Sequence, residues 1–263
     1  MAEKTINIGT EINPLRHTII GGATGSGKSV AMNGILLEIL LAFPKAKYHL
    51  FDIKRVEFAR YQNILPVYKT IEQIESGLKG LHREMNAKYE EMEQKGEIKS
   101  DKYTFIFIDE IGVLLNHRDR VRAKAIKGYI EDFAMLGRAA GFFLICATQY
   151  VVKESVPMIV KMQSQKIVLK CDSDIGYRVM SDRKYYDLQR PGDAYIKLES
   201  GEVKRFQVNY YSDELVKECI KIIEEKLKEA NIIPGVQQKK REEITIEDDK
   251  SIIGNLINWL IKK

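Results

Sequence analysis

The sequence is poor in cysteine and histidine. Its three cysteines, Cys146, Cys171 and Cys219, stand far apart among 263 residues. Their spacing fits no metal site, and so few cysteines indicate a reducing compartment. The four histidines are scattered and form no ligand cluster, so we expect them to be packing or surface residues. These absences argue against a metal centre built from cysteine or histidine.

Long apolar runs are also missing, and no stretch of the sequence is long enough to span a membrane. The N-terminus lacks the pattern of a signal peptide, so we expect a soluble, cytoplasmic protein. The charge excess is small, because 42 Lys and Arg against 37 Asp and Glu give +5. A mildly basic chain is compatible with a polyanionic partner but does not establish one. The length allows one large α/β domain, or one domain with an appendage.

The sequence does contain a complete phosphate-binding loop pattern, within HTIIGGATGSGKSV at residues 17–30. A β-branched run precedes it and a helical pattern follows, as this pattern requires. Glycines let several backbone N–H groups converge on one anion, and the helix start adds its positive dipole end. Lys28 would reach the outer phosphates of ATP, and Ser29 would ligate Mg²⁺. The alternative is a Gly/Ser-rich turn between core elements. The residues expected to bind the nucleotide are Gly22, Ala23, Thr24, Gly25, Ser26, Gly27, Lys28, Ser29, Val30 and Asp109.

Strand and helix patterns alternate along the chain. The predicted strands cover residues 18–20, 47–51, 66–68, 103–108 and 142–147, and the predicted helices cover residues 28–43, 71–95 and 118–138. A hairpin over residues 194–208 and a helix over 212–227, capped by Ser212, complete the pattern. Continuous apolar strands that alternate with helices are typical of a covered parallel sheet. We therefore expect an α/β fold with a mostly parallel sheet and helices on both faces.

Polar side chains end two of the predicted buried strands. Asp109 and Glu110 follow four consecutive apolar residues. Asp109 would support the Mg²⁺ shell opposite Ser29, and Glu110 would act as the base that polarises a water. Gln149 ends the next strand and would sense the γ-phosphate or orient the water. The alternatives are two solvated acids at a strand end and an ordinary turn.

Further stretches of the sequence match short motifs that occur together in one protein family. FDIKRVEFARY, residues 51–61, matches an Asp-Pro-Lys…Glu segment at Asp52, Lys54 and Glu57, with Ile53 in place of the proline. The other stretches are EMNAKYEEM, FIFIDEIGVLL, LGRAAGFFLICATQ and Arg190-Pro191-Gly192-Asp193-Ala194. Together with the phosphate-binding loop, they resemble the FtsK/SpoIIIE family of DNA-translocating motors over residues 5–225.

The resemblance implies a RecA-like P-loop NTPase core, a hexameric ring and ATP-driven movement along double-stranded DNA. It also implies that ATP lies between subunits and that a neighbour supplies an arginine. Arg138, in a family-typical segment, is the first candidate for that arginine, and Arg178 is the second. The alternative for either residue is a surface or sheet-capping arginine.

Basic residues after the second motif are candidates for contact with DNA. Positive side chains pair with phosphates without distinguishing bases, as a processive motor requires. The alternative is a solvated helix start. The loop after Gln149, with Lys153 and Lys161, is the other candidate. The residues of the first candidate are Arg118, Arg120, Arg122, Lys124 and Lys127, against the single acid Asp119.

The sequence departs from the family pattern in three ways. The family's N-terminal membrane segment and extra domain are not matched, and Tyr150-Val151 stands where Arg-Pro is usual. The C-terminal winged helix is missing or reduced to one helix. We therefore expect a motor domain over residues 1–230, a charged linker over 231–250 and an amphipathic helix over 251–263. That helix is a remnant of the winged helix, a partner-docking element, a membrane-surface helix or a helix packed on its own protein.

The resemblance leaves the biological setting open among plasmid transfer, genome packaging and chromosome segregation. Two other function classes also stay open. One is a protein-secretion ATPase built on the same core, which would respond to a peptide or partner instead of DNA. The other is a nucleotide-gated binding module that switches without processive work. Glu110 and Gln149 argue against it, because a slow switch does not need residues that serve rapid hydrolysis.

Overall fold

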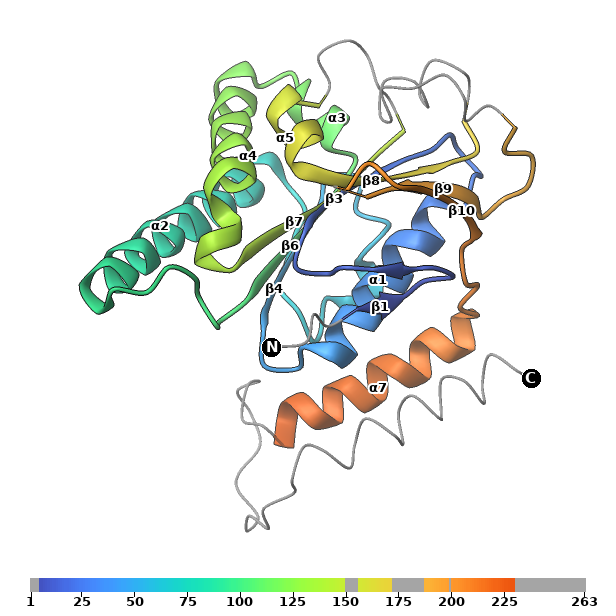
Figure 1. The fold of residues 1–263 in the computed structure, drawn as a ribbon, viewed down its shortest axis with the longest axis horizontal. Coiled ribbons are helices and arrows are strands. Elements are labelled where there is room, and N and C mark those ends of the chain that lie inside the picture. Colours follow the sequence, from blue (N-terminus) through green and yellow to red (C-terminus); the bar gives the residue numbers. More distant parts are fainter. Residues whose placement is uncertain (1–4, 150–155, 172–186, 199, 230–263) are drawn as a thin grey trace.

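The computed structural model describes residues 5–149, 156–171, 187–198 and 200–229. Its centre is an eight-stranded sheet in the order β10-β9-β8-β3-β7-β6-β4-β5 (Figure 1). The strands from β8 to β5 are parallel, and β9 and β10 add an antiparallel edge. The strand bounds are β3 His17–Gly21, β4 Lys47–Asp52, β5 Val67–Tyr68, β6 Thr104–Asp109, β7 Phe142–Thr148, β8 Ser164–Leu169, β9 Asp193–Lys197 and β10 Val203–Gln207.

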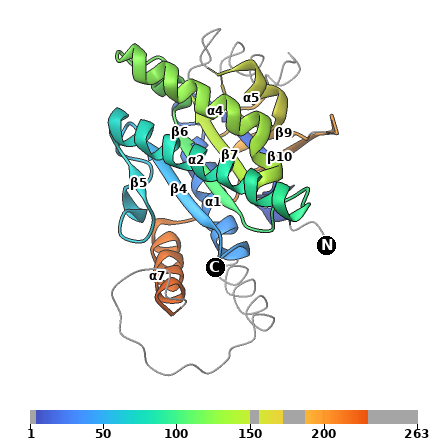
Figure 2. The same cartoon turned by 90° about the vertical axis from the view of Figure 1, so that its left-hand side faces the viewer.

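Helices cover both faces of the sheet, so the α/β fold expected from the sequence is confirmed. Helices α1 and α7 pack on one face, and α2, α3, α4 and α5 pack on the other (Figures 1 and 2). A small hairpin of β1, Ile6–Asn7, and β2, Glu11–Ile12, joins the α1 face. The helix bounds are α1 Lys28–Ala42, η1 Ala59–Tyr61, α2 Ile71–Lys95, α3 Ile111–Leu115, α4 Arg120–Ala140, α5 Met158–Gln163 and α7 Asp213–Glu229. None of the described helices is long and apolar enough to cross a membrane.

Local chemistry sets the ends of the two long helices on the second face. Thr70 caps α2 by accepting a hydrogen bond from the Gln73 N–H, and Asp119 caps α4 in the same way. Gly141 ends α4 with φ 84°, and a Cβ there would lie 2.1 Å from a backbone carbonyl oxygen. Only glycine suits both the conformation and the space.

The structure adds elements that the sequence analysis does not predict. Strand β8 lies beside β3 in the centre of the sheet, although it begins with the polar residues SQK. Gln165 is buried there because its amide donates to Thr18 Oγ1 and to the Asn13 carbonyl, both at 2.9 Å. A polar side chain with such partners interrupts the apolar pattern without leaving the core. Helices α3 and α5 and the β1–β2 hairpin are too short to show a period.

Some sequence-based expectations lie outside the described residues. They are the charged linker over 231–250, the helix over 251–263, Tyr150-Val151, Lys153 and Arg178. Cys146 and Cys219 are buried, and neither forms a disulfide bond within the described residues.

A buried histidine at the start of β3 predicts an acid-sensitive fold. His17 Nδ1 accepts the Leu144 N–H at 3.0 Å, and burial lowers the pKa of His17 from 6.5 to about 4. The unfolded chain therefore binds more protons between these values, so stability falls as pH drops from 6.5 toward 4. A full shift of this size corresponds to about 3 kcal/mol. We expect His17→Asn, which keeps an acceptor for Leu144, to reduce the slope of this pH dependence in urea melts; His49, whose pKa burial also lowers to about 4, contributes the rest. An unchanged slope would contradict the assignment.

Candidate active site

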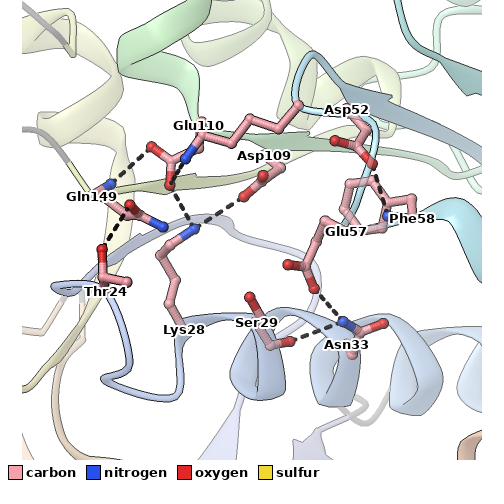
Figure 3. A network of polar contacts seen from close by, with 11 residues as sticks. Thr24, Lys28, Ser29, Asn33, Asp52, Glu57, Phe58, Asp109, Glu110 and Gln149 are labelled. Carbon is pink, nitrogen blue, oxygen red and sulfur yellow. Dashed lines mark hydrogen bonds and ion pairs between the residues drawn. The ribbon is translucent and has the colours of Figure 1, made fainter.

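The motif residues from distant parts of the sequence meet at one edge of the sheet. Strands β3, β7, β6 and β4 are parallel, so their carboxyl ends lie together. Gly21 is in register with Thr148, and Asp52 with Asp109. The loop after β3, the acidic pair at the end of β6 and Gln149 after β7 consequently surround one space (Figure 3).

The loop between β3 and α1 is shaped to receive an anion. Gly25 and Gly27 have φ values of 75° and 95°, which side chains disfavour. Among the described residues, no acceptor meets the backbone N–H groups of Thr24, Gly25, Gly27, Lys28 and Ser29. These donors stand at the start of a fifteen-residue helix, where the dipole is positive. We call this loop, with these backbone N–H groups, the anion cradle, and its geometry fits a phosphate chain.

Lys28 points from the first turn of α1 into the site. Its Nζ lies 3.0 Å from Asp109 Oδ1 and 2.9 Å from Glu110 Oε1, and all three side chains are buried. Burial alone would lower the pKa of Lys28, but attraction to Asp109 and Glu110 outweighs it and raises the pKa. Lys28 thus stays positively charged where phosphates would bind.

Glu110 occupies an unusual backbone position between β6 and α3. It has φ 52° and ψ 54°, the left-handed region that non-glycine residues rarely adopt, and its side chain is fully buried. Glu110 Oε2 accepts the Gln149 N–H at 3.0 Å, and Oε1 lies 3.4 Å from Lys54 Nζ. Strained backbone of this kind occurs at functional sites, where surrounding contacts hold it.

Gln149 connects the two halves of the site. Its side-chain Oε1 accepts a hydrogen bond from the Thr24 hydroxyl at 3.2 Å, and its N–H binds Glu110 (Figure 3). A conformational change in the phosphate loop can therefore be transmitted to Glu110 through Gln149 alone.

A segment after β4 adds site residues whose roles the sequence analysis does not assign. Glu57 Oε1 accepts from Asn33 Nδ2, which also donates to the Ser29 carbonyl at 3.0 Å. Burial raises the pKa of Glu57. Asp52 Oδ2 accepts the Phe58 N–H at 3.0 Å and so shapes the segment. In the sequence, the match of Asp52, Lys54 and Glu57 to the family motif marks these residues for attention. Only the fold shows that they lie at the site.

The oxygen donors at the site fit Mg²⁺. The Ser29 hydroxyl and the Asp109 carboxylate face the same space from α1 and β6 (Figure 3). Hard oxygen ligands, few in number, are what Mg²⁺ takes from P-loop proteins, because it retains several waters. Glu57 lies on the Ser29 side and could accept a hydrogen bond from such a water.

Arg138 does not join this site within the chain. It lies in the last turn of α4, before the amino end of β7, whereas Gln149 follows the carboxyl end. Seven residues of strand between them correspond to about 20 Å. If Arg138 contacts a nucleotide, that nucleotide must therefore be bound to another subunit.

The basic stretch before and along α4 is only partly available for DNA. Arg122 binds Asp119 through Nη1 at 2.5 Å and Glu75 through Nε at 3.4 Å, so its charge is already paired. Lys127 lies 4.0 Å from Glu131, a loose pair at the surface. Arg118, Arg120 and Lys124 are exposed, and in the described part of the chain they form no ion pair. In the other candidate loop, Lys161 belongs to α5 and is 9% exposed, which is a poor position for a phosphate contact.

The fold and the site together define a P-loop ATPase. A parallel sheet, a phosphate cradle at a helix start and a carboxylate pair on a neighbouring strand are its parts. Within this class, the sequence also matches one particular family. Residues 4–112 match the FtsK/SpoIIIE family, and the resemblance inferred from the sequence is confirmed.

One curated relative is the DNA translocase FtsK of Sporosarcina ureae, with 28% identity over 83% of this chain and 31% of the relative. The chain thus spans about a third of that protein's length. Among solved structures, the pCW3 conjugation coupling protein TcpA with ATPγS has a TM-score of 0.74 at 24% identity, covering 83% of this chain and 70% of that chain. The type VII secretion ATPase EccC of Thermomonospora curvata has a TM-score of 0.68 at 20% identity, covering 82% and 29%. These structural likenesses concern the fold.

Proposed function

We propose that this chain is the ATP-hydrolysing motor of a DNA translocase that moves double-stranded DNA through a hexameric ring. The main support is the meeting of Lys28, Asp109, Glu110 and Gln149 around an anion cradle. The FtsK relatives support DNA as the substrate that is moved. The candidate settings are plasmid transfer, genome packaging and chromosome segregation, and the chain is expected to work in the cytoplasm.

Each side chain at the site has a task in this proposal. The N–H groups of the loop bind the phosphates, and Ser29 and Asp109 would hold Mg²⁺, which would supply positive charge against the phosphates. Phosphates compete with Asp109 and Glu110 for Lys28, so nucleotide binding draws Lys28 away from the acids. Glu110 is then free to accept a proton from the attacking water. Gln149 reports the γ-phosphate because it touches both Thr24 and Glu110.

The proposed ring completes the site from a neighbour. Arg138 lies at the far end of β7, so we assign it to the adjoining subunit's nucleotide. An arginine supplied in this way stabilises the charge that develops on the transferred phosphoryl group. Arg178, the second candidate for this role, lies outside the described residues.

Exposed basic residues at the start of α4 are proposed to contact DNA, and charge reversal tests them. We expect the combined Arg118→Glu, Arg120→Glu, Lys124→Glu and Lys127→Glu variant to lose DNA stimulation of its ATPase. Four lost phosphate contacts should reduce the salt slope of DNA binding by about 3 to 4. Arg122 is left unchanged because it is paired with Asp119 and Glu75.

The matched control reverses four exposed lysines elsewhere, in the variant Lys45→Glu, Lys79→Glu, Lys99→Glu and Lys102→Glu. It carries the same change in net charge and should keep both DNA affinity and stimulation. Equal losses in the two variants would indicate a general charge effect, and would remove α4 from the DNA interface. ATPase rates with long double-stranded DNA and fluorescence anisotropy at several salt concentrations give both readouts.

A protein-secretion ATPase is the second candidate, because EccC shares this fold. The two functions differ in the polymer that stimulates turnover. Stimulation by long double-stranded DNA supports the translocase, whereas stimulation only by a peptide or protein partner supports secretion. A sizing measurement with nucleotide present tests the ring, and fast turnover excludes a switch-like binding module.

A further inference from the structure

The pocket beside the phosphate loop has a second wall that none of the phosphate and carboxylate motifs supplies. The pocket has a volume of about 410 Å³, with Lys28 and Ser29 on one side. The other wall comes from the residues just before β9, from the end of β10 and from the residues that follow β10. This wall consists of Pro191, Gly192, Gln207, Val208 and Tyr210.

Hydrogen bonds fix this wall to the phosphate loop. The Gly192 N–H donates to the Ser26 carbonyl at 2.7 Å, and the Val208 N–H donates to the Gly192 carbonyl at 2.8 Å. The loop and hairpin also approach closely, because a Cβ on Gly27 would lie 2.8 Å from the Gly192 nitrogen. The wall therefore keeps a set position relative to any bound phosphates.

Strand order shows which part of a nucleotide this wall would meet. In the sheet, β6 with Asp109 and Glu110 lies on one side of β3, and β8, β9 and β10 lie on the other. A triphosphate whose last phosphate faces Glu110 therefore runs from the β6 side toward the hairpin side. The ribose and base then extend toward Gln207 and Tyr210.

Two side chains of the wall suit a base. Tyr210 is 72% exposed, so the ring that borders the pocket keeps aromatic surface open for stacking. Gln207 Nε2 donates to the Pro191 carbonyl at 3.0 Å, which sets the orientation of the amide. Its Oε1 is therefore the group that remains to accept a hydrogen bond.

We propose that Tyr210 and Gln207 form the base subsite of the nucleotide pocket. Tyr210 stacks on the base, and Gln207 Oε1 accepts a hydrogen bond from the exocyclic amino group of adenine. Guanine presents a carbonyl oxygen at the same ring position and would repel this acceptor. The inference rests on the proposed function, because the loop must first hold the phosphates.

Binding of ATP and of inorganic tripolyphosphate to the full chain tests the subsite by calorimetry. Tyr210→Ala should weaken ATP binding on the order of tenfold, as expected for one lost base–aromatic stack. Tripolyphosphate has no base, so its affinity should not change. Tyr210→Phe keeps the ring and should bind ATP like the parent. Gln207→Met should reduce the preference for ATP over GTP.

The outcomes separate this inference from the function on which it rests. Unchanged ATP affinity in Tyr210→Ala, or equal loss of ATP and tripolyphosphate, would overturn the base subsite while leaving the phosphate site intact. Failure of the parent chain to bind either ligand would overturn both proposals. Thermal melting of each variant checks folding, which the exposed position of Tyr210 should preserve.

Discussion

Replacing Lys28 by methionine is expected to abolish ATP turnover. The rate should fall by at least about 10²- to 10³-fold, the loss that follows removal of one donor that stabilises charge in the transition state. Lys28 is the buried cation between Asp109 and Glu110, and its pKa is raised by those acids. Without it, phosphates entering the cradle meet two carboxylates with no compensating charge. Nucleotide affinity should therefore fall together with the rate. Steady-state ATPase assays and equilibrium nucleotide binding measure the two effects.

The same substitution leaves buried acids unpaired, so stability needs its own measurement. Removal of one partner from a buried ion pair commonly costs about 3–5 kcal/mol. Melting curves must therefore show that the Lys28→Met variant is folded before its activity is compared. Lys45→Met, at an exposed position remote from the site, is the matched control and should behave like the parent. Normal turnover in a folded Lys28→Met variant would remove the phosphate role.

Glu110→Gln is expected to bind ATP and fail to hydrolyse it, with turnover reduced on the order of 10²- to 10⁴-fold. Glutamine has nearly the same shape, and its carbonyl oxygen can still accept the Gln149 N–H. It cannot take a proton from water. Loss of the carboxylate also frees Lys28 from one competitor, so ATP affinity should hold or rise. Retention of unhydrolysed ATP after rapid gel filtration gives the clearest readout.

Glu84→Gln provides the comparison for this variant. Glu84 lies on α2 and forms an exposed ion pair with Lys47, away from the phosphate cradle. Its substitution should change neither binding nor rate, because exposed pairs contribute little. If Glu110→Gln turned over ATP at the parental rate, another group would have to be the base. If it lost ATP binding, Glu110 would have a structural role instead.

Much of this fold could be predicted from the sequence because local signals agree with tertiary packing. The bounds of α2, for example, follow from apolar spacing, a threonine cap and a left-handed glycine. The phosphate loop is equally local, since its glycines and lysine are consecutive. Strand β8 could not be predicted, because the partners that bury Gln165 come from residues 13 and 18.

The site was predictable as a set of strand ends, but its connections were not. Parallel strands bring Asp109 and Gln149 to one edge, which sequence reasoning can anticipate. The contact of Lys54 with Glu110 and of Glu57 with Asn33 depends on how one irregular segment folds after β4. The distance of Arg138 from the cradle likewise follows from helix direction, which family motifs do not state.

The two borders of the sheet are poor templates for another strand. At one border, β5 has only two residues. At the other, β10 carries exposed Lys204 and Arg205, and Arg205 is tied to acids of the neighbouring segment. Short or charged borders discourage edge-to-edge β pairing between molecules. In the proposed ring, subunits would therefore meet through side-chain surfaces, which can separate and re-form, and not through a continuous sheet that crosses the interface.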